Sequence, residues 1–164
     1  MKFSVKSGIL CHIVVFCCAA MYYLHTDFCL AYDNNVDQNY LIKPTIAYVV
    51  DGDTIKIRLK ERNTSVRLTG IDCYETSTNN HIKYQRNKGL TDDEIILRGY
   101  KAKDELTKIL RKHEDIYLEI TGVDHYSRLV GIFYYKDTKG KYININNEMM
   151  KTGYCPQYIY KGKS

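Results

Sequence analysis

Apolar and polar residues alternate in three stretches of the first half of the chain, and a period of two is typical of half-buried β-strands. The first two stretches are Thr45–Val50 and Ile55–Leu59, and the Asp51-Gly52 pair between them is a strong hairpin signal. A second turn at about Lys60–Thr64 leads to the third stretch, Ser65–Ile71. The pattern therefore predicts a three-stranded meander between residues 45 and 71.

The pattern changes to a helical period near residue 91. Thr91 and Glu94 have the spacing of a capping box, in which each side chain bonds the backbone N–H of the other residue. Apolar residues that fall mostly on one helical face follow: Ile95, Ala102, Leu106, Ile109 and Leu110. We expect Gly99 to break or kink this helix, so that its well-formed part is Tyr100–Lys112.

Further strands are predicted after the helix. Apolar residues alternate over 116–121 and recur over 129–135, with a turn at 137–140. A short helix is expected from about Asn146 to Thr152, since Gly153 is well suited to end it. Residues 72–90 are polar and irregular and are predicted to form a loop. Strands, a helix and strands again indicate an α+β fold, and five short strands suit an OB-type β-barrel with helices packed on it.

The N-terminus has the pattern of an export signal. Lys2 and Lys6 precede an apolar run at residues 8–24, and the small-residue sequence Cys29-Leu30-Ala31 follows. We expect residues 1–31 to be a signal peptide cleaved after about Ala31; the alternative is an uncleaved anchor, although the run is shorter than the about 20 residues that a membrane span needs. Both alternatives place the domain outside the cytoplasm, secreted, periplasmic or membrane-anchored.

Composition and charge are those of one globular domain. The chain has 164 residues, of which 26% are charged and 45% hydrophobic. We expect a flexible arm at 32–44, the domain at 45–160 and a tail at 161–164. The net charge is +5, and loss of two lysines and one aspartate with the signal peptide leaves +4. A multidomain machine and a polytopic membrane protein are excluded by the length and by the single long apolar run.

Two of the six cysteines, Cys73 and Cys155, follow the predicted signal peptide. In an oxidising compartment they can form a disulfide, and the alternative is two free thiols. No Cys-x-x-Cys or His-Glu-x-x-His sequence occurs after residue 31, so we expect no zinc site.

Acidic and basic residues gather at the predicted turns and strand ends. Asp53 lies at the hairpin turn, while Asp72 and Glu75 follow the third strand. Two carboxylates on adjacent strands make a plausible site for a hard cation such as Ca²⁺. Arg67 and Arg128, on or beside strands, would hold a phosphate and neutralise charge that grows in a transition state. Taken singly, each residue is also explained as a turn residue or a solvated arginine.

Three blocks carry a family resemblance, and they occur at residues 50–54 (VDGDT), 67–75 (RLTGIDCYE) and 124–128 (DHYSR). Together, in this order, they resemble the staphylococcal nuclease (thermonuclease) family, and the resemblance covers residues 45–160. It implies that Asp53 and Asp72 bind the catalytic Ca²⁺ together with the main-chain carbonyl of Cys73. It also implies that Glu75 orients or deprotonates the attacking water. The phosphate-gripping pair would be Arg67 and Arg128, and the substrate contacts would be His125, Tyr126, Tyr158 and Tyr160.

The chain departs from the family pattern at three positions. Tyr74 stands where the family usually has Pro, so the turn that aims Glu75 is expected to be looser. Ser127 stands where a Gly usually precedes the second arginine, and a positive φ there would strain a serine. His125 replaces a common lysine, which would make phosphate binding pH-sensitive. A Cys73–Cys155 disulfide would rigidify the site and replace the constraint of the missing Pro.

The resemblance implies an exported, Ca²⁺-dependent nuclease that hydrolyses phosphodiester bonds of DNA and RNA with little sequence preference. The alternative is a non-catalytic OB-type module that binds single-stranded nucleic acid. Retention of all five acids and arginines of the inferred centre favours the enzyme. Nucleic acid is the expected partner of a monomer, no protein partner is implied, and membrane contact is expected only if the N-terminal segment is uncleaved.

Overall fold

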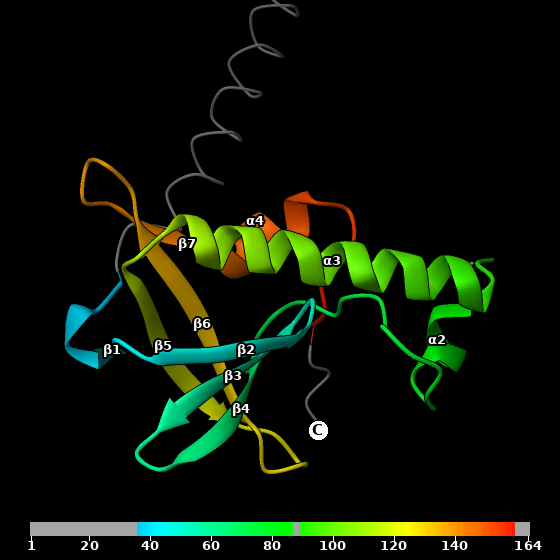
Figure 1. Cartoon of the computed structure of the whole chain (residues 1–164), viewed down its shortest axis with the longest axis horizontal. Coiled ribbons are helices and arrows are strands. Elements are labelled where there is room, and N and C mark those ends of the chain that lie inside the picture. Colours follow the sequence, from blue (N-terminus) through cyan, green and yellow to red (C-terminus); the bar gives the residue numbers. More distant parts are fainter. Residues whose placement is uncertain (1–35, 87–88, 160–164) are drawn as a thin grey trace, which may run out of the picture. The chain divides into compact units, whose positions relative to one another are not determined.

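The computed structural model describes residues 36–86 and 89–159 (Figure 1). The predicted signal peptide, Tyr160 and the predicted tail lie outside the described residues. The compact unit that carries the described elements spans Asp37–Ser164. In the described part of the chain, none of the helices is long and apolar enough to cross a membrane.

A curled, mixed sheet dominates the domain and contains seven strands within the described residues. They are β1 (Leu41–Ile42), β2 (Thr45–Asp51), β3 (Thr54–Leu59), β4 (Arg62–Leu68), β5 (Ile116–Val123), β6 (Leu129–Lys136) and β7 (Tyr142–Asn144). The strand order is β1-β5-β6-β4-β3-β2, and β7 pairs with β6. The β4–β6 pair is parallel and the other pairs are antiparallel. The α+β, OB-type prediction is confirmed.

The prediction of five strands is wrong because two strands are too short to show an alternating pattern. β1 has two residues and β7 has three. A short 3-10 helix, η2 (Gln38–Tyr40), precedes β1, so both elements fall in the segment expected to be an arm. The meander of β2, β3 and β4 is confirmed. Its second turn is tighter than expected, since β4 begins at Arg62 and Lys60 takes a positive φ of 54°.

The described chain contains three α-helices: α2 (Ile82–Arg86), α3 (Asp92–Lys112) and α4 (Ile145–Lys151). α3 contacts β2 and α4 contacts β6, whereas α2 packs against α3. The capping box of α3 is present, with the Glu94 N–H donating to the Thr91 hydroxyl. The expected break at Gly99 is wrong, because α3 continues through it. Gly99 is instead buried against the backbone of Glu75, where a Cβ atom would collide with the Glu75 carbonyl.

The loop prediction for residues 72–90 is also wrong in part, because α2 lies within it beside the first turns of α3 (Figure 1). α2 has only five residues, so its sequence spans too few turns to show a helical period. Its buried residues are Ile82 and Gln85, which are three positions apart and therefore share a helix face.

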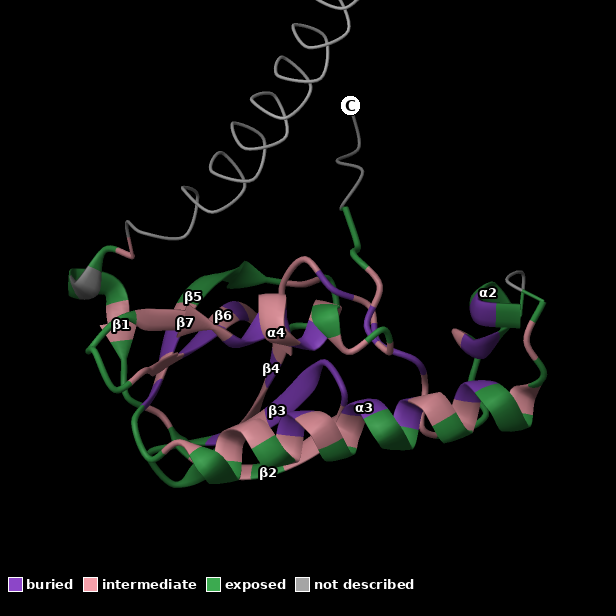
Figure 2. Cartoon of the chain, turned by 90° about the horizontal axis from the view of Figure 1, so that it is seen from above, coloured by how far each residue is buried: buried purple, intermediate pink, exposed green. Residues whose placement is uncertain are grey.

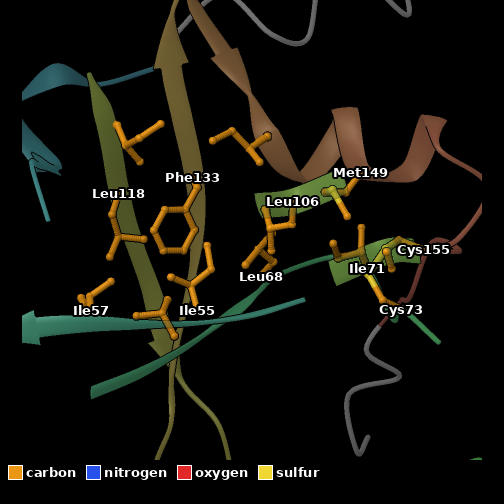
Figure 3. Packing of buried hydrophobic residues seen from close by; sticks show 14 residues of the cluster. Ile55, Ile57, Leu68, Ile71, Cys73, Leu106, Leu118, Phe133, Met149 and Cys155 are labelled. Atoms are coloured by element: carbon orange, nitrogen blue, oxygen red, sulfur yellow. A yellow bond between two sulfur atoms is a disulfide. The ribbon is translucent and has the colours of Figure 1, made fainter. Parts of the chain in front are cut away.

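The hydrophobic core lies between the inner face of the sheet and the helices. Strand residues such as Ile55 and Phe133 meet Leu106 of α3 and Met149 of α4, all fully buried (Figure 3). Buried positions recur every three or four residues along α3, as Figure 2 shows. Complete burial of one such side chain stabilises the fold by about 1.5–3 kcal/mol, so this stripe fixes α3 on the sheet.

After α4 the chain turns back and pairs with the segment that follows β4. Gly153 takes a φ of +77° and ends the helix, as predicted. The N–H of Asp72 donates to the Pro156 carbonyl at 3.0 Å, and the N–H of Tyr158 donates to the Gly70 carbonyl at 2.9 Å. A disulfide joins Cys73 to Cys155, next to the Asp72–Pro156 bond (Figure 3). The C-terminal segment is therefore fixed beside residues 70–74.

Candidate active site

The site begins where the β2–β3 turn meets the end of β4. Thr54 of β3 is the register partner of Arg67 of β4, which puts Asp53 beside Arg67. The Arg67 guanidinium bridges two carboxylates, with Nη1 2.9 Å from Asp53 Oδ1 and Nη2 2.8 Å from Asp72 Oδ1. The hairpin turn and the residues after β4 are thus joined by one side chain.

Asp53 is buried, with only 4% of its surface exposed. Its Oδ2 accepts the N–H of Cys73 at 2.9 Å, and the Thr54 hydroxyl donates to its Oδ1 at 3.1 Å. Burial raises the pKa of Asp53 to about 7, even though the positive charge of Arg67 acts to lower it. Repulsion by Asp51 and Asp72 acts in the same direction as burial, and the hydrogen bond from the Cys73 N–H acts with Arg67 to lower the pKa of Asp53.

The Glu75 carboxylate is held on both of its oxygens by the segment before α2. Asn79 Nδ2 donates to Glu75 Oε2 at 2.7 Å, and His81 Nδ1 lies 3.0 Å from Glu75 Oε1. The other ring nitrogen of His81 is 3.9 Å from Asp72 Oδ2. These contacts fix which way the carboxylate faces.

Gln85 of α2 holds the backbone on either side of Tyr74. Its Oε1 accepts the N–H of Glu75 at 3.1 Å, and its Nε2 donates to the carbonyl of Cys73 at 2.9 Å. Gln85 is 4% exposed, so both bonds are shielded from water. The sequence reasoning missed Asn79, His81 and Gln85, because polar residues in a polar segment give no signal that they face inward.

The second arginine is presented by the loop between β5 and β6. Asp124 Oδ1 accepts the N–H groups of Tyr126 and Arg128, each at 2.9 Å, and its Oδ2 accepts Arg128 Nε at 2.7 Å. Ser127 has a φ of 62°, so the position where the family usually has Gly does adopt the left-handed region. The Arg128 guanidinium lies 5.4 Å from the centre of the Tyr126 ring.

These groups surround one cavity of about 480 Å³. Its walls are formed by Asp51, Arg67, Asp72, Glu75, Asn79, His81, His125, Tyr126, Arg128 and Tyr158. Two predicted residues, Asp53 and Cys73, are buried and absent from this lining, although Asp53 bonds the Arg67 that lines it. Tyr160 lies outside the described residues. Tyr126 and Tyr158 are 69% and 43% exposed, so both rings are accessible from solvent.

The donor set suits a hard cation. Within residues 36–86 and 89–159, no group of three or more His, Cys, Asp or Glu is arranged to hold a metal ion. Ca²⁺ takes carboxylates, main-chain carbonyls and water, so the carboxylate oxygens of Asp53 and Asp72 and the carbonyl oxygen of Cys73 are of the chemical kind that it binds. That carbonyl uses one lone pair for Gln85 and keeps the other. A divalent cation would be attracted by the neighbouring carboxylates of Asp51, Asp53 and Asp72.

Comparison with known proteins identifies the family. The family described as "Staphylococcal nuclease homologue" matches residues 65–164. The chain belongs to this staphylococcal nuclease family. The matched range contains Arg67, Asp72, Glu75 and Arg128, whereas Asp53 precedes it. The predicted resemblance is therefore confirmed at the level of the family.

Two curated relatives of this staphylococcal nuclease domain are similar over most of the chain. An uncharacterized protein of Methanocaldococcus jannaschii, MJ1439, is 30% identical over 135 residues, which are 78% of this chain and 65% of that protein. Endonuclease YhcR of Bacillus subtilis is 31% identical over 114 residues, which are 68% of this chain. The chain spans only 8% of the length of the endonuclease.

Proposed function

We propose that the protein is a Ca²⁺-dependent nuclease that hydrolyses phosphodiester bonds of DNA and RNA. The observation that carries the proposal is the cavity in which two arginines, Arg67 and Arg128, share walls with the carboxylates of Asp72 and Glu75. The family assignment and the similarity to an endonuclease support the same reaction class.

Phosphate binding is assigned to the two guanidinium groups. Arg67 is held in place by its bonds to Asp53 and Asp72, so its side chain loses little conformational entropy when a phosphate binds. Arg128 is held through Nε by Asp124, which leaves its two terminal nitrogens to meet phosphate oxygens. Planar guanidinium groups bind phosphate through paired hydrogen bonds and stabilise charge that grows on its oxygens.

Glu75 is assigned to the attacking water. Its carboxylate is oriented by Asn79 and His81, so it can accept a proton from a water at a fixed position in the cavity. That water attacks the phosphorus in line with the leaving oxygen. A Ca²⁺ ion held by Asp53, Asp72 and the Cys73 carbonyl would polarise the phosphoryl oxygens and neutralise part of their charge.

Substrate tolerance is expected from the kind of contacts available. The arginines are expected to contact the phosphate backbone, which carries no sequence information. Tyr126 and Tyr158 offer exposed rings on which any base can stack. This arrangement supports cleavage of both DNA and RNA with little base preference, by a monomer whose only required partner is nucleic acid.

We also propose that the enzyme acts outside the cytoplasm, secreted, periplasmic or anchored. The proposal is supported by the basic and apolar pattern of residues 1–31 and by the pairing of Cys73 with Cys155, because disulfides persist in oxidising compartments. Mass spectrometry of the protein recovered from medium, periplasm and membranes tests it. Intact residues 1–31 on protein found in the cytoplasm would contradict it.

The test of nuclease activity is release of acid-soluble nucleotides from single-stranded DNA and RNA, with Ca²⁺ and with a chelator. Glu75→Gln keeps the shape of the side chain but cannot accept the proton, and we expect it to lower kcat by roughly 10²–10⁴-fold. Arg67→Ala should abolish release, and Lys139→Ala, an exposed residue on the turn before β7, should behave as the parent protein. Strand binding without Ca²⁺-dependent release would instead establish a binding module.

A further inference from the structure

The outer face of the β2–β3–β4 meander is a surface that the cavity does not include. Ile55, Ile57, Val66 and Leu68 are fully buried and mark the inner face of β3 and β4. Because side chains alternate between faces along a strand, the residues between them point to the opposite face. Arg67 belongs to this outer set, so the surface begins at the cavity wall.

The register of β3 and β4 places cations in a row on this outer face. Arg67 lies opposite Thr54, while Lys56 lies opposite Ser65 and is a diagonal neighbour of Arg67. Arg58 is two residues beyond Lys56 on the same strand, which is about 7 Å along β3. The row Arg67, Lys56, Arg58 therefore leads away from the cavity in steps close to the separation of successive phosphates in an extended nucleic-acid strand.

The charges of Lys56 and Arg58 are not neutralised by acidic side chains in the described part of the chain. Among the described residues, neither one makes an ion pair or a side-chain hydrogen bond. Some other basic side chains are paired with acids, as in Lys43–Asp115, Arg86–Asp92, Lys108–Glu105 and Lys151–Glu148, so their charges are less available to a ligand. A row of unneutralised cations attracts a polyanion and releases its counterions on binding.

The neighbours of these cations fit a single strand better than a protein surface. Ser65 and Asn63 are the cross-strand partners of Lys56 and Arg58, and both side chains can donate hydrogen bonds to phosphate oxygens. Tyr48 of β2 is the other partner of Lys56 and is 53% exposed, so it presents a ring for a base.

We propose that the outer face of the meander binds the part of a single-stranded nucleic acid that continues from the scissile phosphate. Lys56 and Arg58 contact successive backbone phosphates, and Tyr48 stacks with a base. The site takes single-stranded DNA or RNA through its backbone and reads no sequence. This inference rests on the proposed function, since it takes Arg67 as a group that holds the scissile phosphate.

The test is the salt dependence of binding of a fluorescent 20-nucleotide oligothymidylate to the full chain in chelator. We expect the double variant Lys56→Gln/Arg58→Gln to bind more weakly and to reduce the slope of log K against log salt by about 1.4, since each phosphate contact on a single strand contributes about 0.7. With Ca²⁺ present, its KM on the long strand should rise while kcat stays unchanged, and cleavage of a dinucleotide should be unaffected.

The matched control is Lys103→Gln/Arg111→Gln on α3. This pair has the same charges and the same burial classes as Lys56 and Arg58, and neither residue forms an ion pair in the described part of the chain. It should leave the slope unchanged. An equal change of slope in both double variants, or none in the Lys56/Arg58 variant, would overturn the proposal.

The two proposals fail separately. Normal cleavage by the parent protein with an unaltered slope in the Lys56/Arg58 variant would refute the strand-binding face and leave the nuclease intact. A reduced slope in a protein that never cleaves would support the face and refute the nuclease. Equal urea unfolding midpoints of the parent and both variants would show that the substitutions leave stability unchanged, so that a difference in slope reports on binding.

Discussion

Ser127 shows at the scale of a single residue how the presentation of Arg128 depends on backbone conformation. Its φ of 62° lies in the left-handed region, where the Cβ of an L-residue crowds the following carbonyl oxygen at a cost of roughly 1–2 kcal/mol. The neighbouring hydrogen bonds from Tyr126 and Arg128 to Asp124 hold the loop in this conformation. The loop therefore tolerates strain in order to aim the arginine.

We expect Ser127→Gly to stabilise the protein by about 1 kcal/mol, because glycine adopts a positive φ without the steric cost. Urea unfolding followed by circular dichroism measures the change. Ser127→Ala is the control and should leave stability near that of the parent protein. A destabilised glycine variant would show that the strain is not relieved at this position.

Asp124 gives a pH prediction at the same scale. Burial acts to raise the pKa of Asp124, but the N–H groups of Arg128 and Tyr126 and the Arg128 side chain lower it below its ordinary value of 3.8. A lowered folded pKa means that the stabilisation is present above pH 3.8 and is lost as the pH falls through the folded pKa.

We therefore expect Asp124→Asn to cost roughly 1–3 kcal/mol of unfolding free energy at neutral pH, since it removes a hydrogen bond between charged groups. The difference between the variant and the parent should shrink below about pH 4, as measured by urea unfolding across a pH series. A difference that is constant down to pH 2 would contradict the assigned charge of Asp124.

At the scale of elements, α2 acts as a support for the loop that carries Glu75. Gln85 bonds the backbone of Cys73 and Glu75, and Gly99 of α3 packs directly against the Glu75 backbone. Two helices thus fix a turn in which Tyr74 stands where the family usually has Pro. The rigidity expected to be lost with that proline is supplied by hydrogen bonds and by close packing.

We expect Gln85→Met to lower kcat with little change in KM, because the buried Cys73 carbonyl and Glu75 N–H lose their partner and the carboxylate loses its orientation. Each unsatisfied group should also cost about 1–3 kcal/mol of stability. Lys83→Met, an exposed residue on the same helix, is the matched control. Parent-like kcat in the Gln85 variant at a temperature where it is folded would refute the positioning role.

At the scale of the whole molecule, the disulfide joins parts of the chain that are 82 residues apart. It fixes the C-terminal segment beside residues 70–74, and this segment carries Tyr158 to the cavity. The same bond therefore restrains both the segment 70–74 and Tyr158 of the cavity wall. Its effect is expected in stability and in activity together.

Replacing both cysteines by serine should lower the unfolding free energy by roughly 2–4 kcal/mol, the usual effect of opening a long covalent loop. It should also raise KM, because Tyr158 and residues 70–74 are less restrained. The control is reductant, which should lower the activity of the parent protein and leave the double variant unchanged. Activity of the parent protein that is insensitive to complete reduction would contradict the restraint.

The fold was predictable from the sequence wherever a pattern ran for several residues. The meander, α3 with its capping box and the helix ended by Gly153 follow from local periodicity and turn chemistry, which act within a few residues. β1, β7 and α2 were missed because elements of two to five residues carry no measurable period. The prediction of a break at Gly99 was wrong because the glycine packs against the backbone of Glu75, a distant contact that helix propensity does not take into account.

The sequence by itself determined the family and the candidate acids and arginines, because the three blocks hold these residues at fixed local spacings. Only the tertiary structure decided how they are supported, with Gln85 bonded to the backbone of Cys73 and Glu75 and with Cys155 bound to Cys73. It also aligned Lys56 and Arg58 with Arg67 through strand register. Turn and helix signals depend on neighbouring residues and can be recognised in the sequence. Contacts such as Gln85–Cys73 and Cys73–Cys155, 12 and 82 positions apart, form only after hydrophobic burial has brought those segments together.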